Sequence, residues 1–108
     1  MTDQVFQAIA EPRRRRILRL IRDRELSSGE IAARFEVTRP AISQHLRVLE
    51  RAGLVWVRRK GTRRLYRARP ERLDEVRAFV DAFWAGGLKR LKAAAEAEER
   101  EKRADRKT

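Results

Sequence analysis

The sequence predicts a mainly α-helical chain with one small β-hairpin. Apolar residues recur at helical spacing in four stretches between residues 5 and 52. The pattern then changes to that of strands over residues 54–69, and a helical apolar stripe returns after Pro70. At 108 residues the chain is long enough for one ordinary domain and too short for two.

Two short helices are expected first. Residues 5–10 have their apolar side chains at helical spacing, and Asp3 is a candidate N-cap. Pro12 suits the first turn of a second helix, because the N–H that proline lacks has no partner there. This helix is expected to run to about Arg24. Its first turn holds Arg13–Arg16, where the helix dipole disfavours cations, which indicates either a nearby anion or a solvated run of charge.

A pair of helices joined by a short turn is expected next. Ser27 and Glu30 have the spacing of a capping box, so a third helix begins there and is expected to end near residues 36–37. Thr38 is the N-cap candidate of a fourth helix, which runs to Ala52. Gly53 stands where helices commonly end in a left-handed residue.

A β-hairpin follows these helices. Residues 54–58 are β-branched and aromatic, residues 60–62 have turn composition, and residues 63–69 form the return strand. The side chains expected on the buried face are Val55, Val57 and Tyr66. Trp56 and Leu65 are expected on the opposite face, either covered by another element or partly open.

The charge of the chain is concentrated near this hairpin. The net charge is +12, and residues 96–108 contribute nothing to it because they hold five acidic and five basic residues. Residues 54–69 contain seven basic residues and no acidic one. Biased amino-acid usage explains why most of these cations are arginine, but not why acids are absent from one segment. A polyanionic partner is therefore favoured, because each cation near a phosphate releases a condensed counterion.

The last helix has an apolar stripe too wide for a solvent-facing helix. Because one small domain has little surface left to cover it, a second copy of the chain is favoured, although packing on the first two helices of the same chain is the alternative. The expected dimer interface comprises Phe6, Ile9, Val76, Val80, Phe83, Trp84, Leu88 and Leu91. The domain is expected to span residues 1–95, followed by a charged tail over residues 96–108 that is frayed or disordered.

Helix, short turn, helix and then a basic hairpin is the layout of a winged helix-turn-helix. In that layout the fourth helix enters the major groove, where arginine pairs with guanine and glutamine with adenine. The candidate DNA-binding residues of this helix are Thr38, Arg39, Pro40, Ser43, Gln44 and Arg47. The candidates on the hairpin, or wing, are Arg58, Arg59, Lys60, Thr62, Arg63 and Arg64, which would enter a minor groove or clamp the backbone.

Two stretches resemble the ArsR-type repressors: FQAIAEPRRRRIL at residues 6–18 and AISQHLRVLERAGLV at residues 41–55. Gly61 and Tyr66 also fall where the wing hairpin of that family has them. The resemblance covers about residues 5–70. It implies a homodimer formed largely by the first and last helices, binding to an inverted repeat, and release by a signal. It also places Ser43 and Gln44 where the family meets bases or phosphates.

The metal ligands of that family are missing. Its metal sensors often have Cys-x-Cys in the third helix, where this chain has Ser27 and Gly29. Other sensors use histidines and carboxylates of the last helix, which here has acids but no histidine. The single histidine, His45, lies in the fourth helix and is expected to pack or to face DNA. Since transition metals prefer imidazole and thiolate ligands, we expect no metal and no cofactor; whether a small-molecule inducer exists is open.

Other function classes are less favoured. The sequence has no cysteine, no glycine-rich phosphate loop and no histidine placed beside a nucleophile. It therefore gives no reason to expect an enzyme. A basic RNA-binding or ribosome-associated protein is the alternative, but stacking on RNA needs exposed aromatics and only Trp56 and Trp84 are candidates. The absence of cysteine, of a signal-peptide profile and of an apolar run of ~20 residues favours a cytoplasmic protein without a membrane partner.

Overall fold

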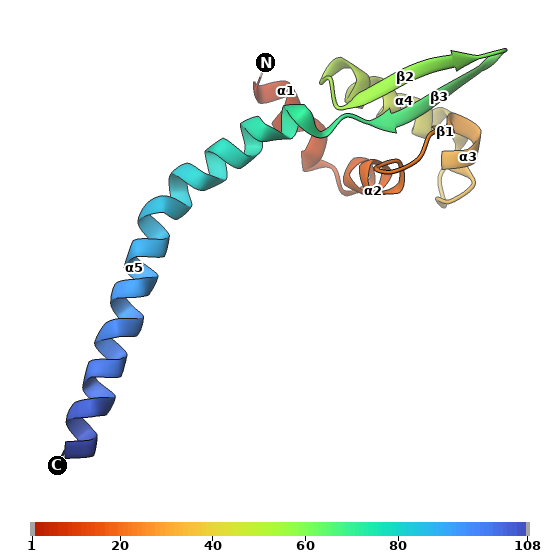
Figure 1. The fold of residues 1–108 in the computed structure, drawn as a ribbon. Coiled ribbons are helices and arrows are strands. Elements are labelled where there is room, and N and C mark those ends of the chain that lie inside the picture. Colours follow the sequence, from red (N-terminus) through yellow and green to blue (C-terminus); the bar gives the residue numbers. More distant parts are fainter. Residues whose placement is uncertain (1, 108) are drawn as a thin grey trace. The chain divides into compact units, whose positions relative to one another are not determined.

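The computed structural model describes residues 2–107, and Figure 1 labels its helices and strands. Of these, residues up to Val76 form one compact unit and residues from Arg77 onward form a second. The first unit contains, in order, α1 (Thr2–Ala10), α2 (Pro12–Leu20), β1 (Leu26–Ser27), α3 (Ser28–Ala32), α4 (Arg39–Arg51), β2 (Val55–Lys60), β3 (Arg63–Ala68) and the 3-10 helix η1 (Pro70–Leu73). The long helix α5 (Asp74–Lys107) begins in the first unit and makes up the described part of the second.

The fold class predicted from the sequence is confirmed: the chain is mostly helical with a small antiparallel sheet. The sheet has three strands in the order β1-β3-β2. β2 pairs with β3 from Val55↔Ala68 to Lys60↔Arg63. Two residues connect these strands, and the first of them, Gly61, has a φ of 64°, a conformation that glycine adopts without steric cost.

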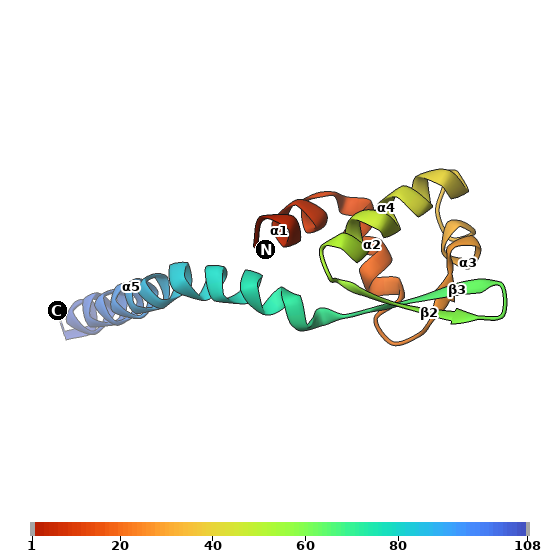
Figure 2. The same ribbon diagram turned by 90° about the horizontal axis from the view of Figure 1, so that it is seen from above.

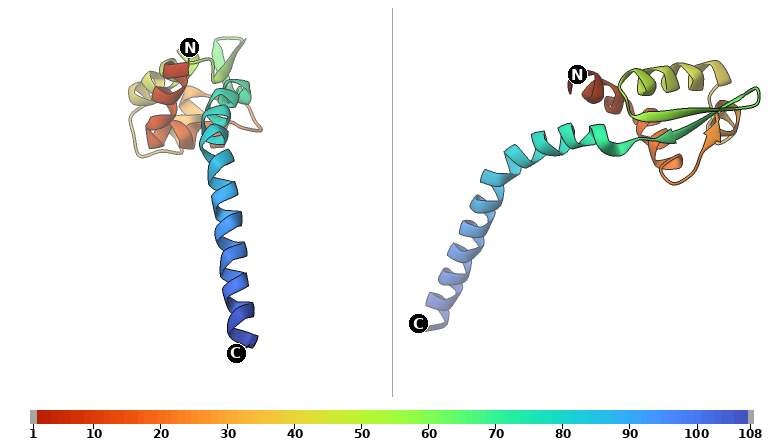
Figure 3. Two further views of the ribbon diagram at one scale, coloured as in Figure 1. Left: turned by 90° about the vertical axis from the view of Figure 1, so that its left-hand side faces the viewer. Right: turned by 45° about the horizontal axis from the view of Figure 1, so that its top comes forward.

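The third strand was not predicted. β1 is two residues long and pairs with β3 through Leu26↔Tyr66 and Ser27↔Leu65. It fixes the segment before α3 to the hairpin. Figure 2 shows α1 and α4 on one side of that hairpin, and Figure 3 shows α4 alongside it.

The predicted boundaries at Ser27, Thr38 and Gly53 are confirmed, whereas Asp3 is not an N-cap, because α1 already begins at Thr2 and Asp3 lies in its first turn. Ser27 and Glu30 form both bonds of the capping box at the start of α3, and Thr38 caps α4. Gly53 has a φ of 73° directly after α4.

Two predicted ends were wrong: α2 stops at Leu20 instead of Arg24, and α3 stops at Ala32 instead of residues 36–37. After α2 the carbonyl of Ile21 accepts from the N–H of Ala68 in β3 (2.9 Å), and after α3 the N–H groups of Arg34 and Phe35 donate to carbonyls three residues back, as in turns.

The core of the first unit lies between the helices and one face of the hairpin. Its largest fully buried side chains are Ile17, Ile21, Ile31, Ile42, Leu46, Leu49, Leu54 and Val5. Tyr66 and Val55 are buried and Val57 is half-buried against this core, as predicted. On the other face of the hairpin Leu65 is covered, whereas Trp56 remains 53% exposed.

The second unit consists of the remainder of α5. The sequence predicted a frayed or disordered tail from residue 96, whereas the structure describes helix through Lys107. Residues 93–104 are alanine, glutamate, lysine and arginine, which favour helix strongly. The pair Glu98–Lys102 (Oε1–Nζ 3.9 Å) has the i,i+4 spacing that supports a helix.

Candidate nucleic-acid interface

Helix α4 exposes one face because the opposite face is anchored in the core. Ile42, Leu46 and Leu49 are buried. The hydroxyl oxygen of Thr38 accepts a hydrogen bond from the backbone N–H of Ala41 (3.3 Å), which fixes the start of the helix. The predicted contact residues therefore lie outside: Thr38, Arg39, Pro40, Gln44 and Arg47 are exposed and Ser43 is half-buried.

A hollow between α4 and the wing brings together six of the predicted DNA-binding residues. Three come from α4 (Arg39, Ser43 and Arg47) and three from the hairpin (Thr62, Arg63 and Arg64). The hollow is also lined by Ser27, Ser28, Glu50 and Tyr66. Four guanidinium groups against one carboxylate make its lining cationic, which suits a polyanion.

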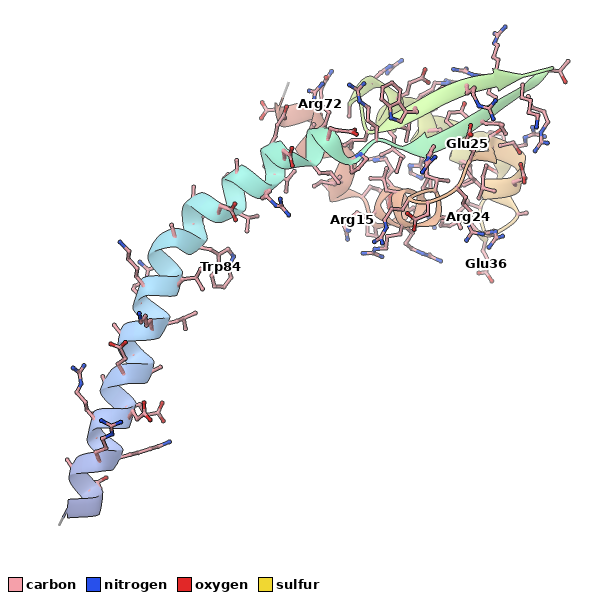
Figure 4. The ribbon with its side chains drawn as sticks, in the orientation of Figure 1. Arg15, Arg24, Glu25, Glu36, Arg72 and Trp84 are labelled. Atoms are coloured by element: carbon pink, nitrogen blue, oxygen red, sulfur yellow. The ribbon has the colours of Figure 1, made fainter. Side chains whose placement is uncertain are left out.

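The other predicted residues do not line this hollow. Thr38, Pro40 and Gln44 lie on the exposed part of α4, and Arg59 and Lys60 are exposed near the turn of the hairpin. Arg58 precedes them in β2 and is bound to Glu25, which lies directly before β1 and is labelled in Figure 4. The predicted wing cations are therefore divided between the hollow, the turn and a carboxylate.

Three carboxylates hold arginines of the wing in the free protein. Arg58 binds Glu25 (Nε–Oε2 2.8 Å), Arg64 binds Glu50 (Nη2–Oε1 3.3 Å), and Arg63 binds Glu30. The hydrogen bond from Arg58 lowers the pKa of Glu25, whereas the bonds from the backbone and hydroxyl of Ser27 are the main cause of the lowered pKa of Glu30. Both carboxylates are thus ionised and available to their arginines at neutral pH.

Sequence reasoning missed these carboxylates as part of the interface. Glu30 was identified only as half of a capping box, and Glu25 and Glu50 had no local signal because their partners lie 33 and 14 residues away. Ser28 could have been found, since the two serines stand at the predicted N-terminus of the first helix of the motif, the end of a helix that contacts phosphate in many proteins.

Two arginines of the run in α2 have a structural use. The Nε of Arg14 donates to the carbonyl of Ala8 (2.6 Å), and Arg15 donates to the carbonyls of Ile9 (2.7 Å) and Ala10 (3.1 Å). These carbonyls lie at the C-terminus of α1, the negative end of that helix. Arg14 and Arg15, which lie at the end of α2 where the helix dipole disfavours cations, therefore cap the C-terminus of α1.

His45 lies within the fold of the first unit. Its ring is half-buried, and its Nδ1 lies 3.3 Å from Nη1 of Arg14. A guanidinium only donates, so Nδ1 is the acceptor. Desolvation is the main cause of the lowered pKa of His45; Glu11 opposes the shift, and Arg14 and Arg13 add to it. His45 thus links α4 to α2, in agreement with the packing role expected for it.

Neither a metal-binding cluster nor a membrane-spanning helix is present among the described residues. No three histidine, cysteine or acidic side chains of residues 2–107 are grouped so that they could hold a metal ion. No helix within the same residues combines the length and apolarity that a membrane span requires.

Comparison with known proteins identifies the family. The model of a family described as "Bacterial regulatory protein, arsR family" matches residues 11–56. The HTH-type transcriptional regulator Rv2034 of Mycobacterium tuberculosis is 43% identical over 86 residues, which are 80% of this chain and 80% of that protein. The chain belongs to the ArsR family. As an ArsR-family protein it is a DNA-binding transcriptional regulator and not an enzyme.

Further relatives agree with this ArsR assignment. The transcriptional repressor SdpR of Bacillus subtilis is 41% identical over 59 residues, covering 55% of this chain and 66% of that protein. A crystal structure described as a possible transcriptional regulator for arsenical resistance is 47% identical, with a TM-score of 0.68, over 81% of this chain and 91% of that one. The ArsR family model spans α2 to the start of β2, and so includes α3 and α4 with the turn between them.

Proposed function

We propose that this ArsR-family regulator is a cytoplasmic, homodimeric repressor that binds an inverted repeat in duplex DNA and does not sense metals. The observation that supports the DNA contacts is the hollow shared by Arg39, Ser43 and Arg47 of α4 with Thr62, Arg63 and Arg64 of the wing. Residues far apart in the sequence converge there on one cationic surface. That surface has hydrogen-bond donors for both phosphates and base edges.

The start of α4 enters the major groove in this proposal. Arg39, Ser43 and Gln44 contact base edges, Pro40 lies against a thymine methyl, and Arg47 contacts a phosphate or a base. Thr38 caps the helix through its oxygen, so its hydroxyl proton stays free to bind a phosphate.

The wing contacts the neighbouring backbone or minor groove. Arg63 and Arg64 line the hollow, and on DNA each leaves its carboxylate partner, Glu30 or Glu50, to bind a phosphate. Arg59 and Lys60 are exposed near the turn of the hairpin and contact the DNA there. Arg58 remains at the base of the wing, where it is available only after Glu25 releases it.

A second copy of the chain covers the apolar stripe of α5. Val80, Phe83, Trp84, Leu88 and Leu91, predicted for the interface, are 40–69% exposed, and Phe79 beside them is 54% exposed. Figure 4 shows the side chain of Trp84 standing away from its helix. A patch of this kind on a water-soluble helix indicates a protein partner. Phe6, Ile9 and Val76 are half-buried in the first unit and complete the proposed interface.

Repression follows from occupancy of a promoter. A dimer on an inverted repeat presents its two recognition helices about one helical turn apart, ~34 Å, and blocks access to the duplex it covers. The relative SdpR is named a transcriptional repressor, which supports this direction of control. The absence of cysteine and the engagement of the only histidine with Arg14 support a regulator without a metal signal.

The test is binding to the DNA upstream of the protein's own gene, compared with random duplex of equal length. Binding is measured by fluorescence anisotropy over a range of salt concentrations. We expect preference for the upstream DNA and a steep loss of affinity with salt, with log K falling by ~0.9 per neutralised phosphate. Arg39→Gln and Arg63→Gln should weaken binding, whereas Arg22→Gln, a matched change just after the end of α2, should not. Equal binding to both duplexes, or tighter binding to structured RNA, would contradict the proposal.

A further inference from the structure

We propose that Arg13, Arg16 and Arg34 form a second phosphate-binding site, beside the turn that joins α3 to α4. The inference rests on the proposed function, because it assigns a further contact of the same DNA duplex. Its three arginines were not among the predicted DNA-binding residues. With this site, the protein binds both phosphate backbones that border the major groove.

The three arginines line one hollow although they come from two elements. Arg13 and Arg16 lie in the first turns of α2, and Arg34 follows the end of α3. Phe35, Glu36 and Val37 complete the lining. The last of these lining residues, Val37, directly precedes Thr38, the N-cap of α4. It shares no lining residue with the hollow between α4 and the wing.

The arginines are available for a ligand. Of the four arginines in the run, Arg14 and Arg15 are used by the carbonyls of α1, whereas no described carboxylate forms an ion pair with Arg13, Arg16 or Arg34. Glu36 is the single acid in the lining, and in Figure 4 it points away from the helices at the turn between α3 and α4. The lining therefore keeps an excess of positive charge.

Two contacts hold this cluster in place. The guanidinium of Arg16 lies over the ring of Phe35, 4.9 Å from its centroid, and Phe35 packs against the core. The backbone N–H of Arg13 donates to both carboxylate oxygens of Glu11 (3.3 Å each), which fixes the start of α2. A guanidinium stacked on a ring retains its outer N–H groups for phosphate oxygens.

The duplex supplies two backbones at the required places. The major groove is about 12 Å wide, so a helix lying in it has a phosphate backbone on each side. The hollow beside the wing serves one backbone through Arg39, Arg63 and Arg64. The cluster of Arg13, Arg16 and Arg34 adjoins the N-terminus of the same helix and shares no residue with that hollow, so we assign it to the other backbone.

The experiment measures the salt dependence of duplex binding for Arg13→Gln and Arg34→Gln in the full chain. Arg16 is left intact because it packs on Phe35. Each change should reduce the slope of log K against log salt by ~0.9, so that the change in affinity over a tenfold range of salt becomes roughly eightfold smaller. The loss should be the same for upstream and random DNA, since phosphates have no sequence. Arg22→Gln removes the same charge outside the cluster and should leave the slope unchanged.

Phosphate ethylation interference then locates the contacts. Phosphates whose ethylation blocks the wild-type protein should fall in two groups, one on each border of the groove. Arg34→Gln should remove interference from one group and Arg63→Gln from the other. If both variants affect the same group, or if Arg13→Gln and Arg34→Gln keep the wild-type slope while Arg39→Gln does not, this inference is wrong and the proposed function stands. If the wild-type chain binds no duplex, both fail.

Discussion

The guanidinium of Arg58 and the carboxylate of Glu25 are joined by two hydrogen bonds, Nε–Oε2 at 2.8 Å and Nη2–Oε1 at 3.2 Å. This bidentate pair connects β2 to the segment before β1. It removes one cation from the free surface of the wing while both groups stay partly exposed.

Glu25→Gln should strengthen binding to any duplex, because Arg58 is then free for a phosphate. We expect the slope of log K against log salt to steepen by up to ~0.9. Glu71→Gln is the matched control, since it removes an equal charge from η1, where Glu71 pairs with Arg69 (3.7 Å). The interpretation is wrong if the two variants bind alike at every salt concentration.

Gln44→Ala should reduce discrimination between DNA sequences while leaving general affinity almost unchanged. Gln44 is exposed on α4 and has no charge to release counterions. Loss of a bidentate base contact costs about 1–3 kcal/mol at the preferred site. Anisotropy titrations with upstream and random duplex measure the ratio of affinities. A fall in both affinities by the same factor would assign Gln44 to the backbone instead.

Phe83→Asp should convert a dimer into a monomer. Phe83 is 69% exposed in the single chain, so a charge there costs the monomer little, whereas burial of that charge in an interface is expensive. Ala85→Asp introduces the same charge on the opposite side of α5 and should leave the dimer intact. Sedimentation equilibrium gives the mass of each variant. An unchanged mass for Phe83→Asp would exclude this stripe as the interface.

His45 should make stability decrease in mild acid. Its pKa is lowered in the folded state, mainly by desolvation, so the unfolded chain binds the proton more readily. The associated stability is complete above the ordinary histidine pKa of about 6.5 and is lost as pH falls below it. His45→Gln keeps an acceptor for Arg14 but does not titrate. Denaturant unfolding between pH 5 and 8 should show a flatter profile for the variant; parallel profiles would assign the acid loss to other groups.

Ser27→Ala should destabilise the first unit by about 0.5–2 kcal/mol, because the hydroxyl of Ser27 accepts from the backbone N–H of Glu30 (3.2 Å) at the start of α3. Ser28→Ala changes the adjacent serine, which does not provide the cap, and should cost less. Urea denaturation measures both. Equal costs would show that the capping box is not the stabilising feature.

Local signals in the sequence predicted most of the fold. Ser27, Thr38 and Gly53 each act within a few residues of their own position, and the structure places a cap or a left-handed residue at all three. The strand β1 escaped prediction because two residues have no periodicity, and its formation depends on β3 almost forty residues later.

The cationic hollow between α4 and the wing was only partly predictable for a similar reason. Side-chain type and helical position identified Arg39, Ser43 and Arg47, and charge identified Arg63 and Arg64. The partners of the charged residues are distant in sequence: Glu25 lies 33 residues before Arg58, and the carbonyl of Ala8 that Arg14 binds belongs to another helix. Which arginines stay free for a ligand is therefore a property of the tertiary structure.

Ser27 takes part in three features at once, since it pairs with Leu65 of β3, caps α3 and lines the hollow beside α4. Because the same residue is bound to the hairpin and caps the helix, we expect a movement of the hairpin to move α3 as well. We therefore expect that any signal that weakens DNA binding by this regulator displaces the wing and α3 together, and not the wing alone.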